Sequence, residues 1–441
     1  MKKLQNFEES FKLVKKWRIL TVGVFLIGTF LLSVGMANTA ARKELIFWTT
    51  HVQFPHYSGY IEMKGKEFAR LHPEISGVKV VVVPYEGYLS KFLTAFMGRK
   101  NAPDMFEAMT HQWAGLFDFA DPVPEDFLKK VEEKIVPYVR EQGMGVDGIR
   151  YGIPTEGDNF IMLYINTDMF TESGLDPDKP LTNFSELLNY ARKLTKYDKS
   201  GKITREGIAI RYSGHPIGIT DKYTPFLHGM GGRLVAPDWS TADGYVDSPE
   251  SLKTLTYYTD LVRKWKVASL EVGTPATAFA QGLAAMIPRE GWYAGYLRDN
   301  APDIHYKVYP FPLDENALGP TVYPMFPWVN MVYKYSPNKD LAWKFFEYWW
   351  TVEDDLEAHR VQDMLGVWKE NLNTEWAKTR PFYKALMTML ENQPYAPAYY
   401  HPKANKLAFE YGASVLNALF GQMPPEAAIE EARVNVNALL K

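Results

Sequence analysis

The pattern of residues 44–98 restricts the fold of this chain more than any other feature. In this segment two strongly apolar stretches are separated by an amphipathic one. Residues 44–50 (ELIFWTT) predict a strand, and residues 59–72 predict a helix with one apolar side. Residues 78–85 (VKVVVVPY) form a continuous β-branched run, typical of a strand covered on both faces, and residues 87–98 are again helical. This β-α-β-α order predicts a parallel sheet with crossover helices, hence an α/β lobe whose ligand cleft lies beyond the carboxyl ends of its strands.

The length of 441 residues, of which 46% are hydrophobic, is sufficient for two or three such lobes. No internal repeat, low-complexity tract or long linker separates one part of the chain from another. This favours lobes that are joined by strands passing back and forth between them.

The N-terminus carries six Lys or Arg residues, followed by a nearly uncharged stretch from 19 to 37 and small residues at 37–41. This order resembles a secretory signal peptide. An uncleaved membrane anchor is the main alternative, because about 18 apolar residues just span a bilayer, and a buried core helix is another. We expect residues 1–41 to direct export and to lie outside the folded lobes.

The charge and the cysteine content exclude several classes of function. Without the six basic and two acidic residues of positions 1–41, the totals of 49 basic and 52 acidic residues become 43 and 50, a formal charge of −7. An acidic exported chain lacks the basic face that nucleic-acid binding requires. The absence of cysteine rules out disulfides, thiol nucleophiles and cysteine metal sites.

No catalytic or cofactor motif is present. The nine histidines show no metal-ligand spacing, and neither a G-x-S-x-G elbow nor a phosphate-binding loop occurs. Glu156 and Asp158 resemble the acid and base of a glycosidase, although two carboxylates so close together in a turn are usually solvated. We therefore expect no enzymatic activity, no metal and no cofactor.

Aromatic side chains follow the predicted strands. In QGLAAMIPREGWYAGY (residues 281–296), a strand at 283–287 is expected to end at 288–291, which places Trp292 on a turn. Because strand ends face the cleft of an α/β lobe, these rings are candidates for a binding surface, with half-buried core packing as the alternative. The aromatic residues at such positions are Trp48, Tyr85, Tyr88, Trp113, Trp292 and Trp328.

Eight segments in order carry a family resemblance: IFWTTH, EFARLHPEISGVKVVVVPYEGYLSKFLTAF, NAPDMF, DGIRYGIPTEGDNFIMLYINTDMFTESGLD, GMGGRLV, FAQGLAAMIPREGW, YSPNKDLAWKFFEYWWT and ALFGQMPPEAAIEEARVNVNALL. Together they span essentially the whole chain after the leader. The chain thus resembles the extracellular solute-binding proteins of ABC transporters, specifically the sugar-binding branch that includes maltose-binding protein.

The resemblance implies a periplasmic-binding-protein-like fold of two α/β lobes, each with a mixed, mainly parallel sheet. The N-terminal lobe would comprise residues 42–155 and 325–375, and the C-terminal lobe residues 156–324 and 376–441. Crossover hinge strands are expected near 153–159 and 322–327. A sugar or oligosaccharide would bind between the lobes of a periplasmic or extracellular monomer, and hinge closure would present the ligand to a membrane permease.

The resemblance also implies that Trp292 stacks on a sugar ring, whose hydroxyl groups need polar partners nearby. The ligand identity stays open because GDNF and PMFPWVN depart from the family pattern. A polyamine, phosphate or peptide ligand, or an exported glycoside hydrolase, are the alternatives. The full set of candidate ligand-binding residues is Trp48, His51, Tyr85, Glu86, Asp104, Trp113, Glu156, Asp158, Asn159, Arg289, Glu290, Trp292, Trp328 and Trp368.

Overall fold

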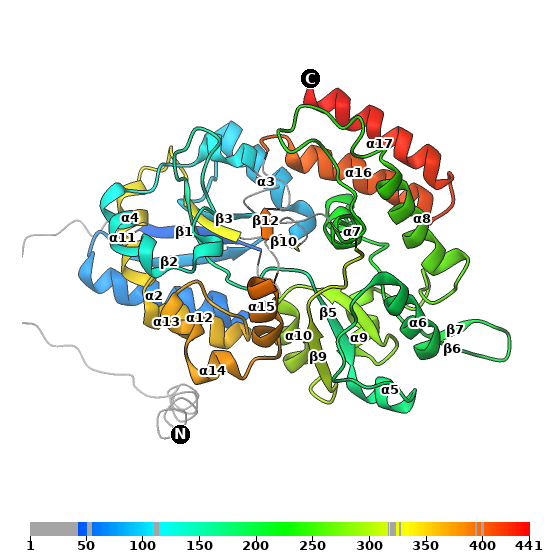
Figure 1. The fold of residues 1–441 in the computed structure, drawn as a ribbon. Helices are drawn as coiled ribbons and strands as arrows, with labels where there is room; N and C mark the ends of the chain where they lie inside the picture. The colour runs from blue at the N-terminus through cyan, green and yellow to red at the C-terminus, as the bar shows by residue number, and fades with distance from the viewer. Residues whose placement is uncertain are drawn as a thin grey trace, which may run out of the picture. The chain divides into compact units, whose positions relative to one another are not determined.

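A five-stranded sheet forms the centre of the first lobe (Figure 1). Strands β2, β1 and β3 are parallel to one another, while β11 pairs antiparallel with both β3 and β4. This sheet confirms the expected mixed, mainly parallel arrangement. In spatial order its strands are β2 (Ile75–Val82), β1 (Lys43–Thr49), β3 (Met105–Met109), β11 (Trp328–Val332) and β4 (Gly152–Pro154).

The computed structural model describes residues 43–50, 55–109, 114–315, 317, 323–325, 328–392, 395–397 and 401–441. The predicted leader at 1–41 lies outside the described residues. Within the described part of the chain, no helix is both long and apolar enough to cross a membrane.

Helices cover both faces of the first sheet. On β1, the ring of Phe47 meets Phe346 of α11 (Lys339–Trp349), whereas the next residue, Trp48, packs on Phe92 of α3 (Tyr85–Gly98). Successive residues of a strand point to opposite faces, so these two helices lie on opposite sides of the sheet. Helix α2 (Pro55–Leu71) joins α11 through a contact of Phe68 with Phe345. Burial on both faces is thus found for β1, whereas the expectation of it for residues 78–85 is wrong: β2 lies at the edge of the sheet, and Lys79 and Val82 on it are exposed.

The second lobe has a smaller sheet with a different pattern. Its three strands are β8 (Met286–Arg289), β5 (Met162–Asn166) and β9 (Tyr306–Tyr309), and both pairings are antiparallel. The expectation of a mainly parallel sheet is wrong for these strands. Parallel pairing is found beside β8, where Glu206 forms a bridge with Ala284 and the backbone N–H of Ala209 donates to Met286.

The chain crosses between the two sheets at the first predicted position. Strand β4 belongs to the first sheet and β5 to the second, so residues 155–161 form the connection. Of the second predicted crossover, 322–327, only β10 (Tyr323–Met325) is described, and it pairs in parallel with β12 (Tyr395–Pro397). The five strands of the first sheet and the three of the second fall within the predicted ranges of their lobes, whose bounds otherwise stay a prediction.

The stretch around Trp292 folds differently from the sequence-based expectation. Strand β8 continues through Pro288 and Arg289 instead of stopping before them, and it lies at the edge of the three-stranded sheet, where proline is tolerated. Trp292 is then the first residue of α10 (Trp292–Asn300), with Gly291 at the N-cap. The tryptophan therefore begins a helix and does not lie on a turn.

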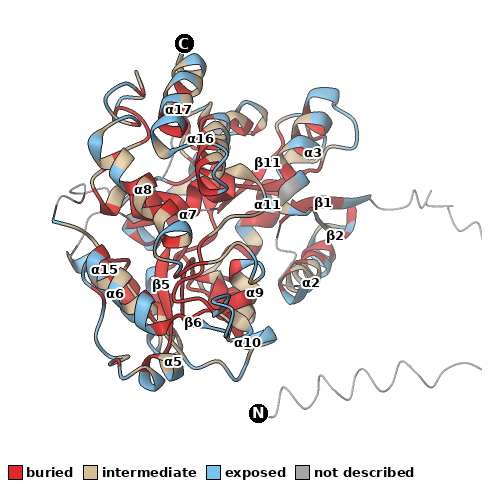
Figure 2. Ribbon diagram, turned by 90° about the vertical axis from the view of Figure 1, so that its right-hand side faces the viewer, coloured by how far each residue is buried: buried red, intermediate tan, exposed pale blue. Residues whose placement is uncertain are grey.

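The remaining elements surround these sheets, and Figure 2 shows that buried residues concentrate in the strands and on the inner sides of the helices. Helix α7 packs against α16, which in turn contacts α17. The other helices and strands are α4 (Glu125–Val131), α5 (Thr167–Glu172), α6 (Phe184–Leu194), β6 (Lys196–Tyr197), β7 (Ile203–Arg205), α7 (Pro216–Gly229), α8 (Pro249–Arg263), α9 (Pro275–Ala280), α12 (Val352–Gln362), α13 (Lys369–Leu372), α14 (Glu375–Lys378), α15 (Pro381–Asn392), α16 (Ala404–Leu419) and α17 (Pro425–Leu440).

Candidate functional site

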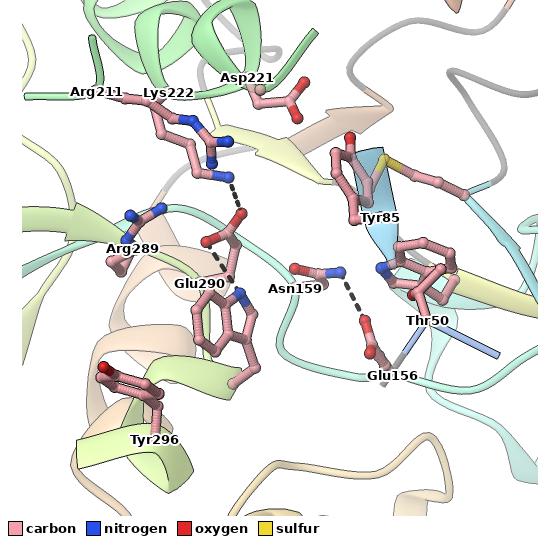
Figure 3. A pocket seen from close by; sticks show the side chains of 14 residues that line it. Thr50, Tyr85, Glu156, Asn159, Arg211, Asp221, Lys222, Arg289, Glu290 and Tyr296 are labelled. Atoms are coloured by element: carbon pink, nitrogen blue, oxygen red, sulfur yellow. Dashed lines mark hydrogen bonds and ion pairs between the residues drawn. The ribbon is translucent and has the colours of Figure 1, made fainter. Parts of the chain in front are cut away.

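A cavity of about 310 Å³ lies between the two lobes (Figure 3). It is found where β1 and β3 end and β11 begins, the edge at which an α/β sheet presents its ligands. Its described lining residues are Thr50, Tyr85, Met109, Glu156, Asn159, Arg211, Gly218, Asp221, Lys222, Arg289, Glu290, Trp292, Tyr296 and Trp328. Both lobes and the first crossover thus contribute to one site.

The wall from the first lobe is largely apolar. Trp328, the first residue of β11, pairs with Met109, the last residue of β3. The ring of Trp328 meets the edge of Tyr85, the first residue of α3, with ring centres 6.4 Å apart. Thr50 follows β1 directly. Strand termini and the start of α3 thereby place two aromatic rings, one methionine and one hydroxyl at the same edge of the cavity.

The wall from the second lobe combines an aromatic pair with a buried ion pair. Glu290 follows β8, and its carboxylate is bonded to the ammonium group of Lys222 from α7. Its other oxygen accepts a hydrogen bond from the indole Nε1 of Trp292 at 3.2 Å. Tyr296 lies one turn further along α10, with its ring at 82° to the indole. The indole is therefore fixed by its polar edge while its ring borders the cavity.

Burial and charge act in opposite directions on this ion pair. Burial lowers the pKa of Lys222 more than the neighbouring carboxylates of Glu290 and Asp221 raise it. For Glu290, burial raises the pKa, but Lys222 and Arg289 together lower it more, so the pKa is below its ordinary value. Because these shifts leave Glu290 ionised and held by Lys222, the pair is a fixed dipole in the wall.

The first crossover supplies the polar floor of the site. The amide of Asn159 donates to the carboxylate of Glu156 at 2.6 Å, and both residues line the cavity. Asp158, between them, does not line it. Its Oδ2 accepts from the backbone N–H of Leu365 at 2.8 Å, and burial raises its pKa to about 8. The imagined glycosidase pair of Glu156 and Asp158 therefore has only one member in the cavity.

The structure brings together half of the residues predicted from the sequence and places the others elsewhere. Lining the cavity are Tyr85, Glu156, Asn159, Arg289, Glu290, Trp292 and Trp328. His51, Trp113 and the side chain of Glu86 lie outside the described residues. The four described residues that do not line it are Trp48, Asp104, Asp158 and Trp368.

Three of these four have structural contacts away from the cavity. Asp104 precedes β3, at the opposite end from the cavity, and its carboxylate accepts from the backbone N–H of Ile46 at 2.8 Å. Trp48 is 6% exposed and packs on Phe92, and Trp368 is 3% exposed and packs on Trp350. A strand-end or loop position in the sequence does not specify which end or face of the sheet a side chain occupies.

Sequence reasoning missed seven lining residues. Arg211 follows the segment that pairs with β8, and Gly218, Asp221 and Lys222 belong to α7. Tyr296 carried a usable signal, because it lies four residues after Trp292 and such residues share a helix face. Thr50 follows β1 and Met109 ends β3, and a search for aromatic and charged groups alone passes over them.

The charged side chains of the cavity wall indicate which kind of ligand it suits. Among the described residues, no group of three or more His, Cys, Asp or Glu side chains is arranged to hold a metal ion. The lining side chains with formal charges are three cations, Arg211, Lys222 and Arg289, and three carboxylates, Glu156, Asp221 and Glu290. Such a site suits a polar ligand with both hydrogen-bonding groups and apolar faces.

Comparison with known proteins supplies the family. The chain is 23% identical, over 379 residues, to a maltotriose-binding protein of Pyrococcus abyssi, covering 84% of this chain and 75% of that protein. An ABC transporter solute-binding protein of Thermotoga lettingae, solved with α-D-tagatose, is 26% identical with a TM-score of 0.78, covering 90% of this chain and 100% of that one.

A maltose/maltodextrin-binding domain of Bdellovibrio bacteriovorus, solved with maltotriose, has a TM-score of 0.75 at 19% identity and covers 90% of this chain and 99% of that one. The family described as bacterial extracellular solute-binding protein matches residues 54–354, well over half of the chain. With two α/β lobes, a cavity between them and this match, the chain belongs to the bacterial extracellular solute-binding proteins.

Proposed function

We propose that this protein binds a sugar between its two lobes and delivers it to the permease of an ABC importer. The observation that carries the proposal is the pairing of aromatic rings with fixed polar groups in one cavity. Trp292 and Tyr296 border it from the second lobe, and Tyr85 and Trp328 from the first. The C–H face of a pyranose lies flat on such rings, while its hydroxyl groups bond to side chains around them.

Contributions from both lobes fit a binding mechanism based on hinge closure. A ligand shifts the balance between open and closed forms only as far as it contacts the closed form better. Here Glu156 and Asn159 come from the crossover itself, and the remaining residues come from either side of it. A sugar in this cavity would therefore stabilise the closed form, which the permease then recognises.

The relatives support the class of ligand, because three of the solved neighbours are bound to tagatose, maltotriose and mannobiose. The wall lacks the excess of carboxylates that a polyamine needs, because Arg211, Lys222 and Arg289 balance the charges of Glu156, Asp221 and Glu290. We also propose that the protein is an exported monomer without catalytic activity. In the cavity the carboxylate oxygens of Glu290 are engaged by Lys222 and Trp292, which leaves a poor acid–base pair for hydrolysis.

Calorimetry and thermal unfolding over a panel of sugars test the proposal. The panel contains tagatose, glucose, galactose, mannobiose, maltose and maltotriose, with spermidine as the polyamine control. A ligand at one hundred times its dissociation constant adds about 2.7 kcal/mol to the stability of the folded state. Binding of spermidine with no response to any sugar would overturn the proposal, and release of shorter sugars from maltotriose under single-turnover conditions would show an enzyme instead.

A further inference from the structure

Arg289 is a buried cation for which the described chain provides no carboxylate within ion-pair distance. Its side chain is 5% exposed and lines the cavity, and its Nε has no hydrogen-bond partner among the described residues. Its guanidinium carbon lies 5.9 Å from the ring centres of both Trp292 and Tyr293. Burying an unpaired charge is unfavourable, so a ligand group that pairs with it would remove that cost.

Arg211 is a second guanidinium group in the same wall. Its Nε donates to the carbonyl of Ser213 at 3.2 Å, and no carboxylate forms an ion pair with it in the described residues. Its guanidinium carbon lies 2.7 Å from the position that a Cβ on Gly218 would occupy. The absence of a side chain at Gly218, in the first turn of α7, therefore leaves the space that this guanidinium uses.

The carboxylates of the cavity are committed elsewhere. Glu290 bonds to Lys222 and Trp292 through its two oxygens, and Asp221 lies close enough to raise the pKa of Lys222. On the crossover, Glu156 accepts from Asn159. Arg211 and Arg289 thus remain as two neighbouring positive charges, close enough that Arg211 lowers the pKa of Arg289. Figure 3 shows both on the second-lobe side, around Glu290.

We propose that Arg289 and Arg211 form a subsite for a carboxylate on the ligand, so that the bound sugar is a uronic acid or a chain ending in one. This rests on the proposed function, because the sugar ring is held by Trp292. A planar carboxylate matches the fork of a guanidinium group, and its single negative charge suits a wall that also contains Asp221. A phosphate, with a charge near −2, is the alternative anion, and the experiment below separates it from a carboxylate.

The test compares matched ligands by calorimetry on the intact protein. D-glucuronate is compared with D-glucose, D-galacturonate with D-galactose, and glucose 6-phosphate and glutarate serve as a sugar phosphate and a carboxylate without a ring. We expect a uronate to bind about ten- to hundredfold more tightly than its neutral partner, as charge-assisted hydrogen bonds do. Tighter binding of the neutral sugars, or of glucose 6-phosphate, would overturn the carboxylate subsite and leave sugar binding intact. Binding of glutarate alone would support the subsite but overturn the proposed function.

Substitutions of the two arginines test whether they cause the preference for a uronate. In Arg289→Gln and in Arg211→Gln, the ratio of uronate to neutral-sugar affinity should fall by about ten- to hundredfold. Arg70→Gln, which removes the same charge from an exposed position at the end of α2, should leave the ratio unchanged. Cooperative unfolding of each variant shows that it is folded. Arg289→Lys tests the role of the forked guanidinium group, because lysine keeps the charge but should still lower the ratio of uronate to neutral-sugar affinity. An unchanged ratio in both glutamine variants would refute the proposal.

Discussion

The imidazole of His359 in α12 bonds through Nε2 to the backbone carbonyl of Thr155 in the first crossover, at 2.6 Å. Its Nδ1 lies 2.7 Å from the backbone carbonyl of Asp355 and 3.3 Å from the carboxylate of the same residue. All of these partners are acceptors, so both ring nitrogens must donate and the ring must be protonated. A buried imidazolium therefore ties the crossover between the lobes to α12.

This protonated ring predicts a loss of stability at alkaline pH. Burial lowers the pKa of His359, but Asp355 raises it more, to about 9, whereas an unfolded histidine has a pKa of about 6.5. The contribution of the protonated ring to the free energy of unfolding is fully present below about pH 6.5. It disappears as the pH rises through 9, at roughly 1.4 kcal/mol per pH unit. Urea unfolding of the wild type and His359→Gln between pH 6 and pH 10 measures it. If the free energy of unfolding changed equally with pH in the two proteins, this account would be contradicted.

Asp158 predicts a separate dependence on pH. Burial is the main cause that raises its pKa to about 8, so its ionisation weakens the folded state as the pH rises from about 4 to 8. Asp158→Asn keeps an acceptor for the N–H of Leu365 and does not ionise. The stability of this variant relative to the wild type should therefore increase over that range, by up to about 1.4 kcal/mol per pH unit. A constant difference measured by urea unfolding would show that Asp158 stays ionised in the folded state.

Trp292 and Trp48 should respond differently to truncation. Trp292→Ala should weaken sugar binding by about 1–3 kcal/mol, because the indole borders the cavity. Trp48→Ala should instead cost about 3–5 kcal/mol of unfolding free energy, because this ring is packed between the sheet and α3. Calorimetry and denaturant unfolding on both variants separate the two effects. A large stability loss in Trp292→Ala with unchanged affinity would place its ring in the core.

The buried ion pair gives a test by double substitution. Lys222→Met leaves the carboxylate of Glu290 buried without its ammonium partner and should cost about 3–5 kcal/mol of stability. The double variant Lys222→Met with Glu290→Gln removes both charges and should recover most of that loss. Denaturant unfolding of the two single variants and the double variant measures the coupling. Additive losses would mean that the pair does not act as a unit.

The sequence allowed much of the first lobe to be predicted, because residues 44–98 alternate between strand and helix patterns with different periods. It failed locally where tertiary position overrides a residue's preference. Pro288 reads as the end of a strand, yet it lies within β8 because that strand is at a sheet edge. Aromatic residues such as Trp292 allowed part of the cavity wall to be predicted from the sequence. Arg211 and Lys222 were missed, because their place in the wall depends on how α7 packs, which no local pattern reports.

The position of β11 has a consequence for the order in which the protein is made. This strand lies between β3 and β4, although it comes more than 170 residues later in the chain than β4. While synthesis proceeds from the N-terminus, β4 cannot pair with β11, its neighbour in the described sheet, until residues 328–332 have been added. The first sheet can therefore be completed only after the strands of the second have been synthesised, so no single cut of the chain releases the first sheet without the second.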